Sequence, residues 1–174
     1  EKAGGHIESD FIPGDKAAYR ERFVSWLPRA SASGLTGVFD AWAGAPSEEE
    51  AYEIWHSLSE SGDLSLRVFG SVRENDAADR VAAQFKRFEQ TYSSQLIRPE
   101  AIKLAADGVP EGHTAFLLTP YVDSTNEDFG QPMISKANLT ANITTYFSQD
   151  IPVHIHAIGG AAVRMSLDAI ESAR

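Results

Sequence analysis

The stretch "IPVHIHAIGGAAVRMSLDAIESAR", residues 151–174, decides the fold of this chain. Its first part, residues 151–159, is an apolar run that ends at a glycine pair, which predicts a β-strand. Its second part, residues 161–174, places Val163, Leu167 and Ile170 on one face of a helix. A strand followed directly by a helix is the unit from which parallel α/β folds are built.

The same unit recurs towards the N-terminus. Three further apolar runs predict strands at residues 34–40, 64–72 and 101–108. Helical patterns alternate with them at residues 15–33, 46–62, 75–92 and 135–150. Because parallel neighbours need a long crossover, the alternation predicts a parallel sheet. A doubly wound sheet and a (β/α) barrel both fit, although four strands would make only about half of an eight-stranded barrel.

Composition narrows the possible partners. The 174 residues are 43% hydrophobic, which is typical of a globular chain, and the formal net charge is −10. With only fifteen scattered Lys and Arg residues, this charge argues against binding to nucleic acid or to anionic membranes. No apolar stretch approaches the roughly 18 residues of a membrane span, and a signal-peptide pattern is missing, so we expect a cytoplasmic protein.

Two histidines at the end of the last strand are candidates for a metal site. His154 and His156 are two residues apart, so they face the same side of the strand, and His156 lies near its carboxyl end. In a (β/α) barrel this end carries the chemistry. The chain has no cysteine, so a transition metal would need imidazole, carboxylate or a modified side chain. A hydrogen-bonded structural pair is the alternative interpretation.

Lys103 is the second candidate, because it lies inside an apolar run that predicts a buried strand. A buried ammonium is costly, so this lysine is expected to be paired, to have a lowered pKa or to be chemically modified. A lysine that reaches solvent or forms a salt bridge is the alternative. Asp40 and Asp107 each lie at the end of a predicted strand, where a helix cap or a turn is the simplest interpretation.

The remaining polar signals are weaker. His6, His56 and His113 are isolated in the sequence. The acidic segment "DSTNEDFG", residues 123–130, lacks the spaced ligands and closing glutamate of a calcium loop, so it predicts a solvated loop.

Four motifs, taken in order, resemble a known family: "GLTGVFDAW", "LSLRVFGSV", "IKLAADGVPEGHTAFLLTPYVD" and "VHIHAIGGAAVRMSLDAIESAR". They are similar to the central part of the metal-dependent amidohydrolases of family 3, the group related to N-substituted formamide deformylase. The resemblance runs over residues 34–174 and implies a TIM-like barrel. One or two divalent ions, expected to be zinc, would activate water at the strand ends for attack on an amide-type carbon.

The resemblance also implies roles for individual residues. Lys103 matches the family's strand lysine, which can be carboxylated to bridge two metal ions. His156 matches the histidine of the family's "HAIGD" motif, a metal ligand, and His154 is then its neighbour rather than a ligand. The other candidates, expected to support the ligands or to line the pocket, are His154, Asp40, Asp107, Thr114 and Tyr121.

Two departures from the family qualify these expectations. Gly160 stands where the family motif has aspartate. The family's first-strand H-x-H pair, a sixth-strand histidine and an eighth-strand aspartate are not found within residues 1–174. We therefore expect the chain to be a fragment: an α/β fold consisting of a partial TIM (β/α) barrel, with about four parallel strands alternating with helices in a single domain over residues 1–174.

The function expected of the parent protein is metal-dependent hydrolysis of C–N bonds, of the amide or formamide type, in a small molecule. The chain alone is expected to be inactive. The alternative is a catalytically incomplete half-barrel that covers its strand edges by self-association, and on either view we expect a homo-oligomer. An unrelated α/β isomerase would require the matches at Lys103 and His156 to be accidental.

Overall fold

The computed structural model describes most of the chain, namely residues 15–41, 47–123 and 127–174. His6, the last residue of the motif "GLTGVFDAW", the first residue of the helix predicted at residues 46–62, and residues 124–126 of the acidic segment lie outside these ranges. The chain divides into two compact units. The first unit comprises Glu1–Val72 and Gln84–Glu100, and the second comprises Arg73–Ala83 and Ala101–Arg174.

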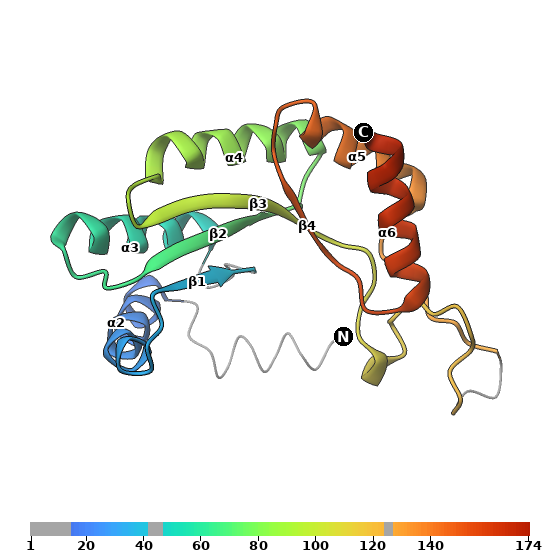
Figure 1. Cartoon of the computed structure of the whole chain (residues 1–174), viewed down its shortest axis with the longest axis horizontal. Helices are drawn as coiled ribbons and strands as arrows, with labels where there is room; N and C mark the ends of the chain where they lie inside the picture. The colour runs from blue at the N-terminus through green and yellow to red at the C-terminus, as the bar shows by residue number, and fades with distance from the viewer. Residues whose placement is uncertain (1–14, 42–46, 124–126) are drawn as a thin grey trace. The chain divides into compact units, whose positions relative to one another are not determined.

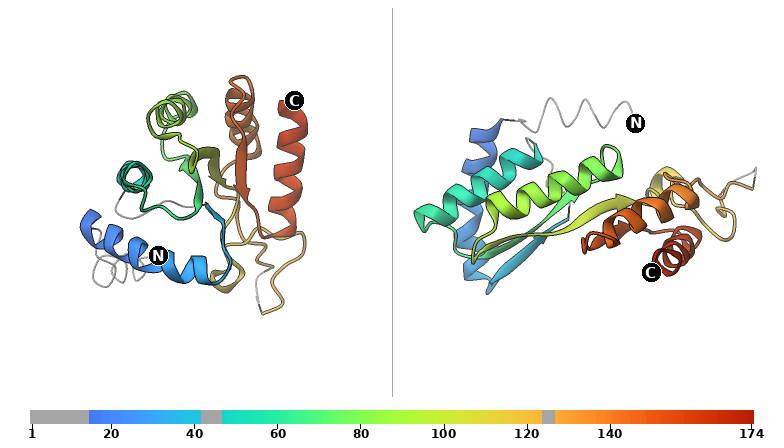
Figure 2. Two further views of the ribbon diagram at one scale, coloured as in Figure 1. Left: turned by 60° about the vertical axis from the view of Figure 1, so that its left-hand side comes forward. Right: turned by 90° about the horizontal axis from the view of Figure 1, so that it is seen from above.

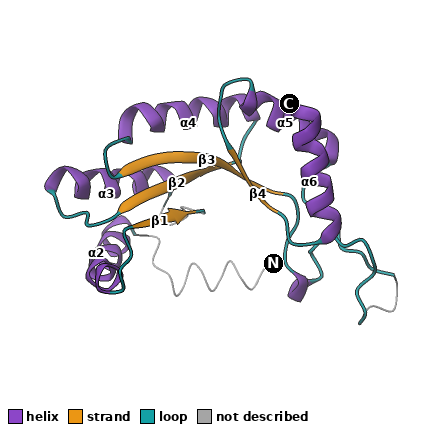
Figure 3. Cartoon of the chain, in the orientation of Figure 1, coloured by secondary structure: helices purple, strands orange, loops and turns teal. Residues whose placement is uncertain are grey.

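Helices and strands alternate along the described chain, as the sequence predicts (Figures 1 and 3). The strands are β1 (Gly37–Asp40), β2 (Arg67–Arg73), β3 (Ile97–Ala105) and β4 (Val153–His156). The helices are α2 (Lys16–Ala32), α3 (Glu48–Ser61), α4 (Ala78–Tyr92), α5 (Lys136–Phe147) and α6 (Gly160–Ala173), with a 3₁₀ turn, η1, at Pro110–Gly112.

The strands hydrogen-bond in sequential order, β1-β2-β3-β4. β1 pairs in parallel with β2, and β3 with β4. Between β2 and β3, the Val68 N–H donates to the Leu96 carbonyl in the first unit, and the Glu74 N–H donates to the Lys103 carbonyl in the second. A doubly wound sheet reverses its strand order at a switch point, whereas a (β/α) barrel does not. The order therefore confirms the partial TIM-like α/β arrangement; the single domain remains a prediction.

The ends of α3 form for the reasons that the sequence suggests. The Ser47 hydroxyl accepts the Glu50 N–H at 3.2 Å, which satisfies one of the N–H groups that the first turn leaves open, and it donates to the Glu50 carboxylate at 2.8 Å. Gly62 ends the helix with φ of 78°, a left-handed conformation that glycine adopts without strain.

An aromatic cluster fills the core of the first unit. The rings of Tyr52 and Trp55 on α3 pack with those of Phe88 and Tyr92 on α4, and the Tyr52 centroid lies 4.8 Å from that of Phe88 and 5.0 Å from that of Trp55. Tyr52, Trp55 and Phe88 are fully buried. Gly70 in β2 completes this packing, because a Cβ there would lie 2.3 Å from the Tyr52 hydroxyl.

The core of the second unit forms where α5 and α6 lie side by side (Figure 2). Leu139 and Ile143 of α5, Ala162 and Ala169 of α6, and Ile102 of β3 are all fully buried. Tyr146 of α5 donates its hydroxyl to the Glu74 carboxylate at 2.6 Å. Burial and then this carboxylate raise the pKa of Tyr146, so the phenol stays protonated and anchors α5 to the end of β2.

β3 corrects one predicted boundary. We predicted this strand over residues 101–108, but it runs from Ile97 to Ala105. The charged residues at its start hid it, because Arg98 and Glu100 break the apolar pattern. In the structure they pair with each other, and the Arg98 guanidinium lies 5.6 Å from the Phe69 ring centroid. The two opposite charges at the start of the strand therefore compensate each other.

Replacing Gly70 with alanine is expected to destabilise the first unit by about 1–3 kcal/mol, because the new methyl group would overlap the fully buried Tyr52 ring. Chemical denaturation measures the effect. The matched control is Gly37→Ala in β1, where a Cβ would meet its nearest atom at 3.4 Å. Equal free energies of unfolding for the two variants would contradict this account of the core.

Candidate functional site

Lys103 and His154 lie side by side at the centre of the β3–β4 pair. The strand register sets Lys103 opposite His154. The Lys103 Nζ lies 3.3 Å from the His154 Nε2, and only 7% of the lysine is exposed. Burial lowers the pKa of Lys103. Burial, the lysine charge and then His156 lower the pKa of His154. Both groups are thus shifted towards their neutral forms, in which they can act as electron-pair donors.

His156 lies one residue pair further towards the carboxyl ends of the strands, opposite Ala105. Its Nε2 is 3.1 Å from the Gly108 carbonyl oxygen. A carbonyl only accepts hydrogen bonds, so Nε2 carries the proton and Nδ1 keeps the lone pair of the neutral ring. A ligand histidine that donates its other N–H to a backbone carbonyl is a common arrangement in metal sites. The spacing of the two histidines in the sequence predicted both as candidates, but the contact between Lys103 and His154 can be recognised only from the strand register.

Asp107 is a buried carboxylate that holds three backbone N–H groups. It is 1% exposed and accepts from Phe116 at 2.8 Å, from Ile158 at 2.9 Å and from Gly159 at 2.8 Å. These donors come from the loop after β3 and the loop after β4. Asp107 therefore ties together the two loops that follow the strands carrying Lys103 and His156, which is more than the turn that its Asp-Gly sequence suggested.

The other three candidates are placed differently. Asp40 is the last residue of β1, in the first unit, and α3 is capped by Ser47 instead. Asp40 contributes, after burial, to raising the pKa of Tyr19 to about 12. The Thr114 hydroxyl accepts the Val109 N–H at 2.9 Å and closes its own loop. The Tyr121 hydroxyl donates to the Ala115 carbonyl at 2.9 Å. Roles for Thr114 and Tyr121 in substrate contact remain predictions.

A cluster around His113 was missed by the sequence analysis, which treated this histidine as isolated. Its Nδ1 lies 3.2 Å from an Asp128 oxygen and its Nε2 lies 3.2 Å from an Asp123 oxygen. The ring stacks on Tyr121 with 4.2 Å between centroids. Both aspartates come from the acidic segment that we read as a solvated loop, so the only sequence signal was acidic residues following a histidine at a distance of ten and fifteen positions.

The donor set near Lys103 fits part of a metal site. Within residues 15–41, 47–123 and 127–174, no three or more His, Asp or Glu side chains form a group that could hold an ion. Lys103 and His156 could each contribute: the lysine through a neutral amine nitrogen or, if carboxylated, through carbamate oxygens, and the histidine through the ring nitrogen that does not contact Gly108. Any further ligands would have to be residues other than Lys103 and His156.

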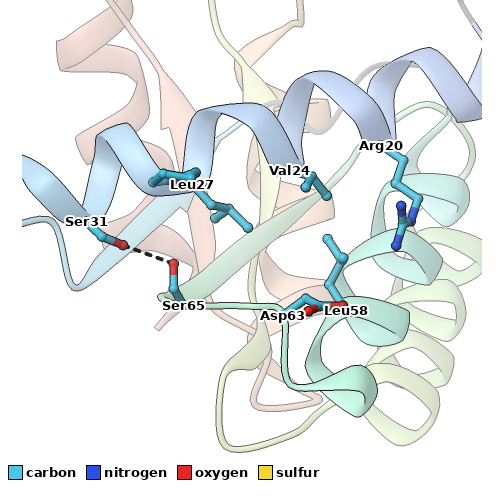
Figure 4. Close-up of a pocket in the computed structure, with 8 residues that line it drawn as sticks. Arg20, Val24, Leu27, Ser31, Leu58, Asp63 and Ser65 are labelled. Carbon is cyan, nitrogen blue, oxygen red and sulfur yellow. Dashed lines mark hydrogen bonds between the residues drawn. The ribbon is translucent and has the colours of Figure 1, made fainter.

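Two hollows lie away from these residues. In the first unit, a hollow of about 310 Å³ lies between α2 and the end of α3 (Figure 4). Val24 and Leu27 of α2 lie on one side of it and Leu58 of α3 on the other, Arg20 and Asp63 also line it, and the Ser31 hydroxyl lies 3.0 Å from that of Ser65. In the second unit, a groove of about 540 Å³ lies between α5, α6 and the loop after β3.

The fold and the side chains near the strand ends define the class to which this protein belongs. Sequential parallel β/α units with charged and imidazole side chains near the strand ends define a protein of the (β/α) barrel class. The model of the amidohydrolase family matches residues 2–174, and the chain belongs to that family. None of the curated proteins matches the chain. The resemblance of the four motifs to the amidohydrolases is thus confirmed at the level of the family, and the relation to N-substituted formamide deformylase stays a prediction.

Two solved structures share the fold. An uncharacterized metal-dependent hydrolase from Pyrococcus furiosus has a TM-score of 0.72 and 22% identity, covering 99% of this chain and 34% of that one. A second, from Pyrococcus horikoshii OT3, has a TM-score of 0.72 and 21% identity, covering 98% of this chain and 33% of that one. The chain therefore spans about a third of the length of these structures. In the described part of the chain, no helix is long and apolar enough to cross a membrane.

The Asp107→Asn variant is expected to lose about 1.5–3 kcal/mol of unfolding free energy, because the amide cannot accept all three N–H groups with charged oxygens. Chemical denaturation measures this loss. The matched control is Asp63→Asn, an exposed aspartate that accepts from the Ser61 hydroxyl. A loss no larger than that of the control would show that Asp107 does not hold the loops.

His113 is expected to titrate above its ordinary value of about 6.5, because Asp123 and then Asp128 raise its pKa. Both ring contacts are hydrogen bonds only in the doubly protonated imidazolium, since carboxylates accept. The stabilisation is complete below the unfolded pKa and is lost as pH rises through the higher folded pKa.

An NMR titration of the His113 ring measures this shift. Asp123→Asn is expected to lower the pKa towards the ordinary value. Asp150→Asn removes the same formal charge at another exposed position and should leave the pKa unchanged. A His113 pKa at or below about 6.5 in the unmodified chain would contradict the arrangement.

Proposed function

We propose that this chain supplies part of the active site of a metal-dependent hydrolase that cleaves C–N bonds, of amide or formamide type, in a small molecule. One observation carries the proposal: an almost fully buried lysine in β3, with its pKa lowered by burial, in a chain of the amidohydrolase family. Burial is costly for an ammonium unless the amine is used in its neutral form.

Lys103 and His156 would hold the metal, with zinc as the proposed ion. A neutral Lys103 amine can add to carbon dioxide and release one proton, which turns the amine into an anionic carbamate with two oxygen donors. His156 would bind through Nδ1, since Nε2 donates to Gly108. When bound, the ion supplies the Lewis acid that activates water and polarises the scissile carbonyl. His154 contacts the lysine nitrogen and supports its orientation.

A second candidate is a chain that is inactive alone and self-associates. It is favoured by the sheet order, because in the described part of the chain β1 and β4 each hydrogen-bond to one neighbouring strand. Unpaired strand edges are sites of association. Under this candidate the chain runs as an oligomer in solution and gains no hydrolytic activity on addition of zinc.

Zinc titration tests the ligand assignment. His156→Ala and Lys103→Met are each expected to weaken zinc binding by at least about tenfold, since even residues that only support a ligand commonly contribute that much. His56→Gln, which removes a histidine from α3 in the first unit, is the control and should bind zinc like the unmodified chain.

Addition of ¹³C-labelled bicarbonate distinguishes a carboxylated Lys103 from a Lys103 that stays a neutral amine. A carbamate carbon signal in the ¹³C NMR spectrum that disappears in Lys103→Met supports carboxylation of Lys103. Zinc affinities that are equal in the unmodified chain and in both variants would contradict the assignment of Lys103 and His156 as ligands.

A further inference from the structure

The groove in the second unit, which we call the α5–α6 groove, has an apolar lining and a cationic rim. Its volume of about 540 Å³ falls within the range of small-molecule sites. Phe116, Leu118 and Met165 contribute apolar surface, and Lys136 and Arg164 contribute positive charge. Leu118 is 69% exposed, so a large apolar side chain is left in water at the mouth of the groove.

The two cations at the rim share one carboxylate. Asp168 accepts from the Lys136 Nζ at 2.8 Å, and the Arg164 Nε lies 3.2 Å from its other carboxylate oxygen. Two positive charges therefore face one negative charge. The Arg164 guanidinium has five N–H donors, and 75% of its side chain is exposed, so it is accessible to an anion from outside the protein.

Gly160 keeps this arginine available. It is the first residue of α6 and stands four positions before Arg164, the spacing at which an acidic side chain would pair with an arginine. The first turn of α6 contains no acidic residue. Gly160 also leaves the groove open next to Leu118, because a Cβ at this position would lie 3.4 Å from a Leu118 methyl carbon.

We propose that the α5–α6 groove binds an amphipathic carboxylate, with its apolar body against Phe116, Leu118 and Met165 and its carboxylate on Arg164 and Lys136. The medium-chain fatty acids are the chemical class that fits, because they combine one carboxylate with an unbranched apolar body. The site needs no metal and does not depend on the proposed hydrolase activity.

Calorimetric titration of the 174-residue chain with octanoate tests the proposal. Arg164→Gln is expected to weaken octanoate binding about two- to fivefold, the range for an exposed charge pair. Asp168→Asn is expected to strengthen it by a similar factor, because the competing carboxylate is removed. 1-Octanol, which has the chain without the charge, should bind more weakly than octanoate to the unmodified protein.

Gly160→Asp is the decisive variant. An aspartate in the first turn of a helix favours folding, so the variant should be at least as stable as the unmodified chain. It should nevertheless weaken octanoate binding, because Asp at this position occupies Arg164 and narrows the groove. Arg20→Gln, at the rim of the other hollow (Figure 4), is the matched control and should not change octanoate binding.

Four results would overturn the proposal: no octanoate binding by the unmodified chain, equal affinities for octanoate and 1-octanol, an unchanged affinity in the folded Gly160→Asp variant, or a loss in Arg20→Gln equal to that in Arg164→Gln. Removal of metal with EDTA separates this site from the hydrolase proposal. Octanoate binding that survives EDTA supports the groove, whereas binding that EDTA abolishes would assign the carboxylate to a metal instead.

Discussion

The arrangement at the carboxyl ends of β3 and β4 depends on the buried carboxylate of Asp107. Its three hydrogen bonds to backbone N–H groups fix the loop after β3 and the loop after β4 against each other. A buried charge is tolerated here because three N–H donors replace the water that it loses. Lys103 and His156 belong to the two strands that lead into these loops, so the carboxylate determines where their strand ends meet.

The same constraint shapes the α5–α6 groove. Phe116, whose N–H is held by Asp107, also accepts the Ala161 and Ala162 N–H groups through its carbonyl. The start of α6 is thereby fastened to the loop that lines the groove. Gly159 permits this approach, because a Cβ there would lie 1.9 Å from the Phe116 carbonyl oxygen. One buried aspartate thus links the strand ends that carry the proposed ligands to the wall of the neighbouring groove.

Electrostatics separates the two proposed sites. Burial drives Lys103 and His154 towards their neutral forms, which suits electron-pair donation. At the rim of the α5–α6 groove, the exposed side chains of Lys136 and then Arg164 hold the pKa of Asp168 below its ordinary value. The first environment favours coordination chemistry, and the second favours recognition of an external anion.

The sequence by itself determined the alternation of strands and helices, the family and the candidate residues Lys103 and His156, because hydrophobic period and motif spacing are local properties of the chain. The sequence did not predict the start of β3, where the charged side chains of Arg98 and Glu100 interrupt the apolar pattern and pair with each other. Only the tertiary structure decided the sequential strand order and the contact of Lys103 with His154. It also decided the three hydrogen bonds that Asp107 accepts and the clustering of Asp123 and Asp128 around His113. Each of these joins residues far apart in the chain, and the distance and direction between such side chains are set by strand register and loop closure, which no local pattern encodes.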